Sequence, residues 1–195
     1  YLGNPNLKKA NTQTEFTKEH IAEFLKCKDD PVYFTHEHIK IVNVDEGLVN
    51  FEMYPFQEKL ISNFHKHRFN ICKMPRQTGK STTVVSYLLH YAIFNDNVNI
   101  GILANKAATA RDLLGRLQLA YENLPSWMQQ GIVAWNKGSM ELENGSKIIA
   151  ASTSASAVRG MSFNIIFLDE FAFVQNHLAD DFFASVYPTI SSGKS

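Results

Sequence analysis

The stretch 74–81, MPRQTGKS, constrains the fold of this 195-residue chain more than any other feature. It follows an alternating apolar run at 69–74, which favours a β-strand, and it precedes a run with helical spacing. A tight loop that leads from a strand into a helix aims backbone N–H groups and the positive end of the helix dipole at one place. The sequence therefore predicts a phosphate-binding loop. The expected buried stripe of the following helix is Val84, Val85, Leu88, Leu89 and Ala92.

The loop departs from the pattern G-x-x-x-x-G-K-[ST] at its first position, where Met74 replaces glycine. A residue other than glycine rarely takes a positive φ, so the entry to the loop must differ from the common form. In this pattern Lys80 reaches the β- and γ-phosphates of a nucleoside triphosphate, and the Ser81 hydroxyl binds Mg²⁺. Alone, Gly-Lys-Ser also fits an ordinary helix start with a solvated lysine, so the context decides.

A second motif, IIFLDE at 165–170, is a wholly apolar run that ends in two carboxylates. Such a run suits a strand buried on both faces of a parallel sheet, whose carboxyl edge carries the ligand sites of α/β proteins. There Asp169 is expected to hold Mg²⁺ through its water shell, and Glu170 to orient and deprotonate an attacking water. An isolated run of this kind would favour a strand with a solvated acidic turn. Its place after a phosphate loop favours the functional interpretation.

Composition is compatible with an enzyme domain. The chain is 45% hydrophobic, enough for a core of its own, and its 19 basic and 19 acidic residues balance, so any contact with DNA must be local or transient. Cys27 and Cys72 have no metal-ligand spacing, which predicts neither a disulfide framework nor a zinc site, and the seven histidines are expected at the surface. The sequence shows no membrane-spanning run and no signal peptide, and it begins without methionine, as a fragment would.

Helices and strands alternate along the chain. We expect an α/β fold of the P-loop NTPase class (RecA-like, ASCE type), with a mainly parallel sheet covered by helices. A small N-terminal extension at 1–52, with helices and a hairpin, would precede the ATPase core at 53–195. Thr17 and Asp30 are the predicted helix N-caps. Helices are expected at 17–28, 31–38, 106–123 and 177–186, and a further one starting at Pro55 with Phe56, Leu60, Ile61 and Phe64 buried. Strands are expected at 98–104, 131–135, 139–142, 146–151 and 165–169, and a hairpin at 41–51.

Five segments taken together point to one family: 75–81, 135–139 (WNKGS), 143–146 (ENGS), 157–160 (AVRG) and the strand end 168–170. Their combination resembles the ATPase domain of a large terminase subunit, above all that of the DNA-packaging motors of T-even-type tailed bacteriophages. The resemblance covers nearly the whole chain. In that family an arginine inside the loop is usual and the first loop glycine is often replaced, which accounts for Met74.

The resemblance implies an ATP site with Mg²⁺ and roles for further residues. Arg76 would bring positive charge to the γ-phosphate in cis, with a structural ion pair as the alternative. Gln57 resembles the family's adenine-reading glutamine, with a surface helix residue as the alternative. Arg159 resembles the arginine that a neighbouring subunit inserts, with a bridge inside its own chain as the alternative. The implied nucleotide-binding residues are Gln57, Pro75, Arg76, Gln77, Thr78, Gly79, Lys80 and Ser81, the metal ligands Ser81 and Asp169, and the catalytic residues Arg76, Lys80, Arg159 and Glu170.

The implied activity is ATP-driven movement of double-stranded viral DNA into a procapsid. Its implied partners are the portal protein and the small terminase subunit, in a ring oligomer on the procapsid in the host cytoplasm, absent from the mature virion. A coupling motif, a lid and a nuclease domain are expected to follow, so this segment should bind ATP, hydrolyse it slowly and lack nuclease activity. Two alternatives stay open: a superfamily 2 helicase-like nucleic-acid translocase, and a nucleotide-binding switch that does not hydrolyse.

Overall fold

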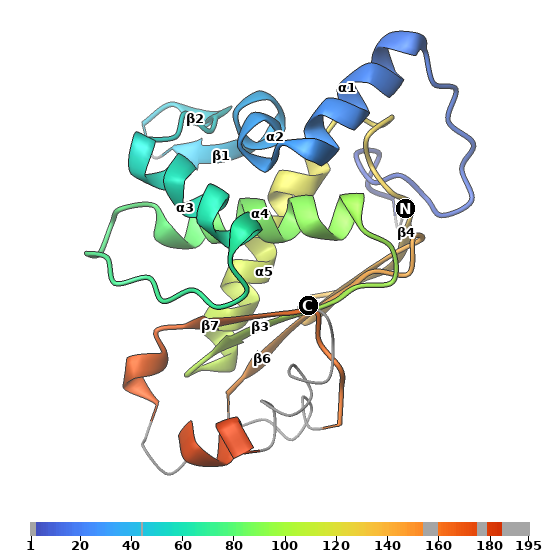
Figure 1. The fold of residues 1–195 in the computed structure, drawn as a ribbon. Helices are drawn as coiled ribbons and strands as arrows, with labels where there is room; N and C mark the ends of the chain where they lie inside the picture. Colours follow the sequence, from blue (N-terminus) through green and yellow to red (C-terminus); the bar gives the residue numbers. More distant parts are fainter. Residues whose placement is uncertain (1–2, 44, 154–159, 175–178, 185–195) are drawn as a thin grey trace.

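A mixed five-stranded sheet forms the centre of the protein, which a computed structural model describes at residues 3–43, 45–153, 160–174 and 179–184 (Figure 1). The strand order is β4-β5-β6-β3-β7. Helix α5 packs against β3 and β6, and α4 packs against α5. The bounds are β3 Asn99–Ala104, β4 Ile132–Trp135, β5 Ser139–Leu142, β6 Lys147–Ser152, β7 Ile165–Asp169, α4 Lys80–Phe94 and α5 Ala107–Glu122.

The direction of the strands differs from the expected mainly parallel sheet. Strand β3 is parallel to β6 and to β7, whereas β5 is antiparallel to both β4 and β6. The reason is the length of the connections. The turns at 136–138 and 143–146 join neighbouring strands directly, whereas a parallel pair requires a crossover of about a dozen residues or more.

The expected strand at 69–74 is absent from the structure: this segment is irregular and pairs with none of the described strands. Phe69 is 62% exposed and Ile71 is 99% exposed. The alternating apolar residues have the composition of a strand, but a strand also requires a hydrogen-bonded neighbour. Within the described part of the chain, β7 pairs only with β3 and lies at the edge of the sheet.

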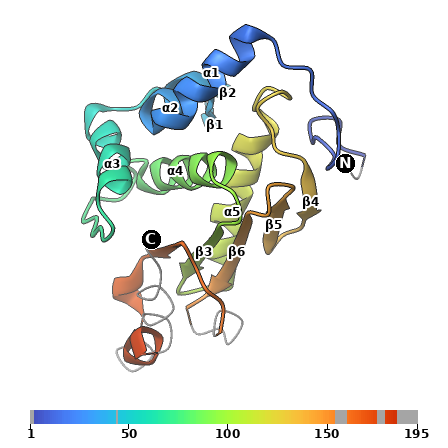
Figure 2. The ribbon, with the colours of Figure 1, turned by 45° about the vertical axis from the view of Figure 1, so that its right-hand side comes forward.

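The N-terminal elements lie on the side of α4 that faces away from the sheet (Figures 1 and 2). The predicted caps are confirmed: the Thr17 hydroxyl accepts from the His20 N–H at 3.2 Å, and Asp30 Oδ1 accepts from two N–H groups at the start of α2. No helix in the described ranges has both the length and the apolar character to cross a bilayer. The elements are α1 Lys18–Asp29, α2 Pro31–His38, β1 Lys40–Asn43, β2 Gly47–Asn50 and α3 Pro55–Lys66.

The buried face of α3 differs from the expected one at its start, whereas Phe64 packs against the core as predicted. Ile61 is fully buried as predicted, but Phe56 is 44% exposed, and Gln57 instead is buried, at 2% exposure. Gln57 and Ile61 are four residues apart and share one helix face, whereas Phe56 lies about 100° away from Gln57. Phe56 stacks on the exposed ring of Tyr54, with centroids 5.6 Å apart.

Both faces of the sheet are covered. On β3, Ile100 and Ile102 belong to the main core, which contains α4 and α5. The next residue, Leu103, points to the other face and packs with Phe163 and Phe182, as the alternation of side chains along a strand requires. Residues 179–184 are helical, which confirms the described part of the helix predicted at 177–186.

His90 lies in the core rather than at the surface. It is 2% exposed on α4, and its Nε2 donates to the Cys27 carbonyl at 2.8 Å, so it joins α4 to α1. Its Nδ1 is a buried atom without a hydrogen-bond partner. Burial lowers the pKa of His90 from 6.5 to about 4. The folded protein therefore disfavours the charged imidazolium.

This lowered pKa predicts acid sensitivity. The contribution of His90 to the free energy of unfolding is fully present above the unfolded pKa of 6.5. It falls as the pH drops toward about 4, because the unfolded chain binds a proton that the folded chain excludes. The slope contributed by His90 should approach about 1.4 kcal/mol per pH unit. His90→Gln keeps a donor near the Cys27 carbonyl but cannot titrate, so this contribution should vanish. Denaturant unfolding across that pH range, with exposed His67→Gln as control, checks this; parallel profiles for wild type and His90→Gln would contradict it.

Candidate functional site

The loop before α4 has the geometry of a tight turn into a helix. Gly79 is the residue before α4, with φ 70° and ψ 11°, and Gln77 also has a positive φ, at 61°. The Thr78 hydroxyl donates to the Pro75 carbonyl at 3.0 Å, which closes the turn. The first amide N–H groups of an α-helix have no partner within the helix, so they are available to an anion in front of Lys80.

Gly79 is required by its backbone and by its surroundings. A Cβ at this position would lie 2.4 Å from Nε2 of Gln57, and the left-handed backbone disfavours any L side chain. A side chain at residue 79 would therefore displace the Gln57 amide from its bond to the Thr78 carbonyl.

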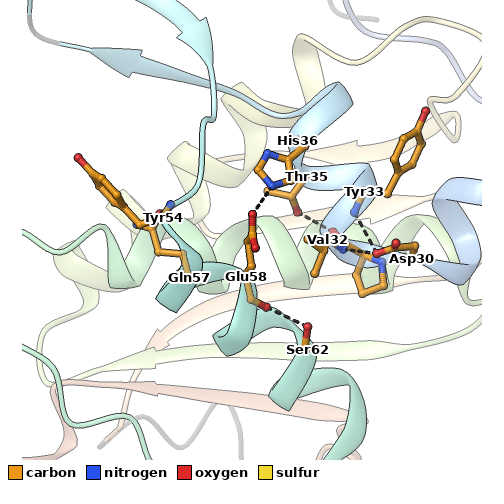
Figure 3. A network of polar contacts seen from close by, with 10 residues as sticks. Asp30, Val32, Tyr33, Thr35, His36, Tyr54, Gln57, Glu58 and Ser62 are labelled. Atoms are coloured by element: carbon orange, nitrogen blue, oxygen red, sulfur yellow. Dashed lines mark hydrogen bonds and ion pairs between the residues drawn. The ribbon is translucent and has the colours of Figure 1, made fainter.

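Gln57 connects the loop to the start of α3, where Figure 3 shows it beside Tyr54. Its Nε2 donates to the Thr78 carbonyl at 3.0 Å, and its Oε1 accepts from the Tyr54 N–H at 2.8 Å. The alternative of a surface helix residue is wrong, since the side chain is buried. Each end of the amide keeps capacity for one more hydrogen bond. Recognition of adenine by Gln57 stays a prediction, but its contacts show that it positions the phosphate loop.

We expect Gln57→Ala to loosen the loop. The variant removes two part-buried hydrogen bonds, to the Thr78 carbonyl and from the Tyr54 N–H, which together should cost about 1–3 kcal/mol of stability and weaken nucleotide binding. Thermal unfolding and titration with an ATP analogue measure the two effects. Gln118→Ala is the matched control, because Gln118 makes one exposed bond, to the Asn136 carbonyl at 3.0 Å. Equal nucleotide affinities for Gln57→Ala and wild type would refute this role.

The two carboxylates lie at the carboxyl end of β7, as predicted. Asp169 is the last residue of β7, in register with Ala104 at the end of β3, and it is 5% exposed. Burial raises the pKa of the Asp169 carboxyl, the positive charge of Lys80 opposes this rise, and the charge of Glu170 adds to it. Lys80 and Asp169 therefore share one electrostatic environment. The start of α4 and the end of β7 lie on the same side of the molecule (Figure 1).

Glu170 has an unusual backbone. Its φ of 50° and ψ of 38° place it in the left-handed region, where residues other than glycine are rare. Such a conformation costs on the order of 1 kcal/mol and is found disproportionately at functional sites. The side chain is exposed. It is therefore available to a ligand beside Asp169.

Arg76 is exposed in the loop and forms no ion pair within the described ranges. The structure gives no support to the alternative of a structural ion pair for this residue. Ser81 is half-buried in the first turn of α4. Arg159 lies outside the described residues, so its role stays a prediction.

A hydroxyl and a carboxylate, from Ser81 and Asp169, are the oxygen donors that Mg²⁺ prefers. Burial raises the pKa of the Asp169 carboxyl, and the charges of Lys80 and Arg116 oppose this rise; a divalent cation beside the carboxylate would favour its ionised form further. The residues at this edge of the sheet therefore fit a magnesium ion.

Two polar residues from the other diagnostic segments have structural roles. The Asn144 amide donates to the carbonyls of Ala92 and Asn95 at 2.9 and 3.0 Å, so it caps the C-terminal end of α4. Asn136 Oδ1 accepts from two N–H groups, of Gly138 and Ser139, and shapes the turn between β4 and β5. The Asn144 contacts hold the C-terminal end of α4 against the turn between β5 and β6.

Sequence analysis missed one side-chain cluster. Glu23, Cys27 and His38 place their ligand atoms within 4.8 Å of one another, although no metal-ligand spacing was recognised around Cys27. His38 is mostly buried, with 12% of its side chain exposed, rather than at the surface. The available signal was the spacing of four between Glu23 and Cys27, which puts both on one face of a helix. His38 comes from the next helix.

A comparison with solved structures bears on the fold. The chain is similar to the crystal structure of the HK97 bacteriophage large terminase, with a TM-score of 0.64 at 17% identity over 81% of this chain. This chain covers 34% of that one, about a third of its length. The likeness shows an α/β fold shared with a phage large terminase.

The family follows from the sequence match. Residues 71–181, more than half of the chain, match the family model described as "Terminase large subunit, T4likevirus-type, N-terminal". The protein belongs to this family of large terminase subunits, as the five diagnostic segments predicted. The matched range contains the phosphate-loop residues as well as Asp169 and Glu170.

Proposed function

We propose that this domain is a P-loop ATPase of the RecA-like class that binds Mg·ATP between the loop 75–81 and the carboxyl end of β7. The observation that carries the proposal is the position of Asp169, which is buried at the carboxyl end of β7 within electrostatic reach of Lys80. It links the phosphate loop to the acidic end of the strand. The left-handed Gly79 and the N-terminal end of α4 supply the phosphate-facing amide groups.

Each residue then has a distinct role. Lys80 and Arg76 neutralise the β- and γ-phosphate charge, and Ser81 and Asp169 hold Mg²⁺, which when bound draws charge from the phosphate oxygens. Glu170 orients and deprotonates the attacking water from its exposed position. Gln57 fixes the loop and, with its remaining hydrogen-bonding capacity, contacts the adenine edge.

Family membership supports the biological role. We propose that ATP hydrolysis here drives double-stranded DNA into a viral procapsid, with the portal protein and the small terminase subunit as partners. The chain would act in a ring oligomer in the host cytoplasm, where Arg159 would reach a neighbouring subunit. Residues 1–52 would form an extension of the ATPase core at 53–195.

The family match disfavours a superfamily 2 helicase-like translocase, because the diagnostic segments and the fold both correspond to large terminases. A nucleotide-binding switch shares the binding site but lacks hydrolysis.

Calorimetric titration with ATP, with and without Mg²⁺, is the first test of the proposal. Saturable binding that strengthens with Mg²⁺ is expected. Binding that is absent, or indifferent to Mg²⁺, would contradict the proposed site.

A further inference from the structure

A second group of potential ligands lies outside the nucleotide site, between α1 and α2. Glu23 and Cys27 are one helical turn apart on α1, and His38 ends α2. The Cys27 Sγ lies 3.6 Å from Glu23 Oε1, and His38 Nε2 lies 2.9 Å from the same oxygen. Thiol, imidazole and carboxylate thus converge on one point.

These distances suit a small tetrahedral metal site. Zinc bonds of about 2.0–2.3 Å place neighbouring ligand atoms roughly 3.3–3.7 Å apart. The spacing of 3.6 Å falls inside that range, the spacing of 2.9 Å lies below it, and all three ligand atoms lie within 4.8 Å of one another. Small side-chain rotations are enough to admit the ion.

The surroundings of the cluster also fit a metal centre. The Tyr33 hydroxyl donates to Glu23 Oε2 at 3.1 Å, which orients the carboxylate and leaves Oε1 directed at Cys27 and His38. The His38 ring packs edge-on against Trp127, with centroids 6.2 Å apart. Outer contacts of this kind fix the orientation of metal ligands. Cys27 is fully buried, whereas Glu23 keeps 29% of its side chain exposed, so water can reach a fourth position from that side.

We propose that Glu23 Oε1, Cys27 Sγ and His38 Nε2 bind one Zn²⁺ ion, with water as the fourth ligand. The ligand set of sulfur, nitrogen and oxygen selects zinc over Mg²⁺, which prefers oxygen donors. Binding replaces the thiol S–H bond by a Zn–S bond and releases the proton to solvent. The ion would join α1 to α2. Through the bond from His90 to the Cys27 carbonyl it would also hold both helices against α4.

The competing interpretation is a hydrogen-bonded network without metal. In that case the thiol stays protonated, since burial and the Glu23 charge raise the pKa of Cys27 to about 12. A metal-bound cysteine is instead a thiolate. The state of the sulfur therefore distinguishes the two interpretations.

Cobalt(II), a spectroscopic substitute for zinc, tests the proposal on the whole 195-residue chain. We expect one equivalent of Co²⁺ to produce the intense near-ultraviolet thiolate-to-cobalt band, and one equivalent of Zn²⁺ to abolish it. Cys27→Ser should lose the band and bind Zn²⁺ at least about 10- to 100-fold more weakly, since loss of an outer contact already costs this much. Cys72→Ser, the other cysteine, should behave as wild type.

Three outcomes would overturn the proposal: no thiolate band in the wild type, a band that Cys27→Ser retains, or a band lost in Cys72→Ser. If Cys27→Ser fails to fold, His38→Gln provides the second variant. It should keep the thiol but lower zinc affinity, and wild-type affinity in this variant would refute the site. Nucleotide binding is not part of the readout, so the result is independent of the proposed ATPase function.

Discussion

Lys80→Ala should cause the largest loss of nucleotide binding of any single substitution in this chain. Its ammonium group is expected to contact the β- and γ-phosphates, and charge-assisted hydrogen bonds contribute about 1.5–3 kcal/mol, which corresponds to a loss of roughly 10- to 100-fold in affinity. Turnover should fall by about a further 100- to 1000-fold, because the same charge stabilises the transition state. Calorimetric titration and single-turnover hydrolysis measure the two quantities.

A matched control is Lys73→Ala, which removes an exposed lysine that precedes the phosphate loop. It should bind Mg·ATP like the wild type. Thermal unfolding of Lys80→Ala, measured alongside, separates the loss of phosphate contacts from the loss of the Lys80 charge near the buried Asp169. Unchanged affinity and turnover in Lys80→Ala would remove the basis for a phosphate site at this loop.

Glu170→Gln should separate binding from hydrolysis. The substitution keeps the size of the side chain and its capacity to accept a hydrogen bond, but glutamine cannot take a proton from water. General-base catalysis contributes about 100- to 10,000-fold, so hydrolysis should fall by that factor while the affinity for Mg·ATP is retained. Single-turnover assays with enzyme in excess over ATP give the chemical step directly.

The control for this substitution is Glu15→Gln, which changes an exposed glutamate before α1, outside the residues assigned to the nucleotide site. Its hydrolysis rate should equal that of the wild type. If Glu170→Gln also hydrolyses ATP at the wild-type rate, or if the wild type does not hydrolyse at all, the chain is better described as a nucleotide-binding switch.

Features of the fold that depend on local sequence were predictable. The caps at Thr17 and Asp30 follow from side chains that bond backbone groups two or three residues away, and the structure contains both. The buried stripe of α4 follows from helical spacing, and all its members are buried. The strand that ends at Asp169 was likewise predictable, because a wholly apolar run that ends in two acids favours a buried strand over other local structures.

Features that depend on distant neighbours were not predictable. The segment at 69–74 has the composition of a strand, yet its pairing depends on which other strand lies beside it. The mixed direction of the sheet is an exception, because it follows from the short turns at 136–138 and 143–146, whereas the expected parallel sheet followed from the general class of fold. Phe56 was assigned to the core by its apolar character alone, whereas the direction of α3 buries Gln57.

The same division holds for the candidate sites. The loop and the acidic strand end were found because their residues are contiguous. The hydrogen bond from Gln57 to the Thr78 carbonyl joins residues 21 positions apart, so no contiguous pattern contains both. The zinc ligands and the buried His90 depend on how α1, α2 and α4 pack, which no pattern within one helix encodes. Only three-dimensional packing brings these groups together.

The most direct test of the account is a crystal structure with Mg²⁺ and an ATP analogue that hydrolyses slowly. It should place the β- and γ-phosphates beside Lys80, with Mg²⁺ about 2.0–2.1 Å from the Ser81 hydroxyl oxygen and joined to Asp169 through water. Glu170 should face the γ-phosphate. A nucleotide bound elsewhere, or a loop and strand end too far apart to contact the same triphosphate, would contradict the central claim.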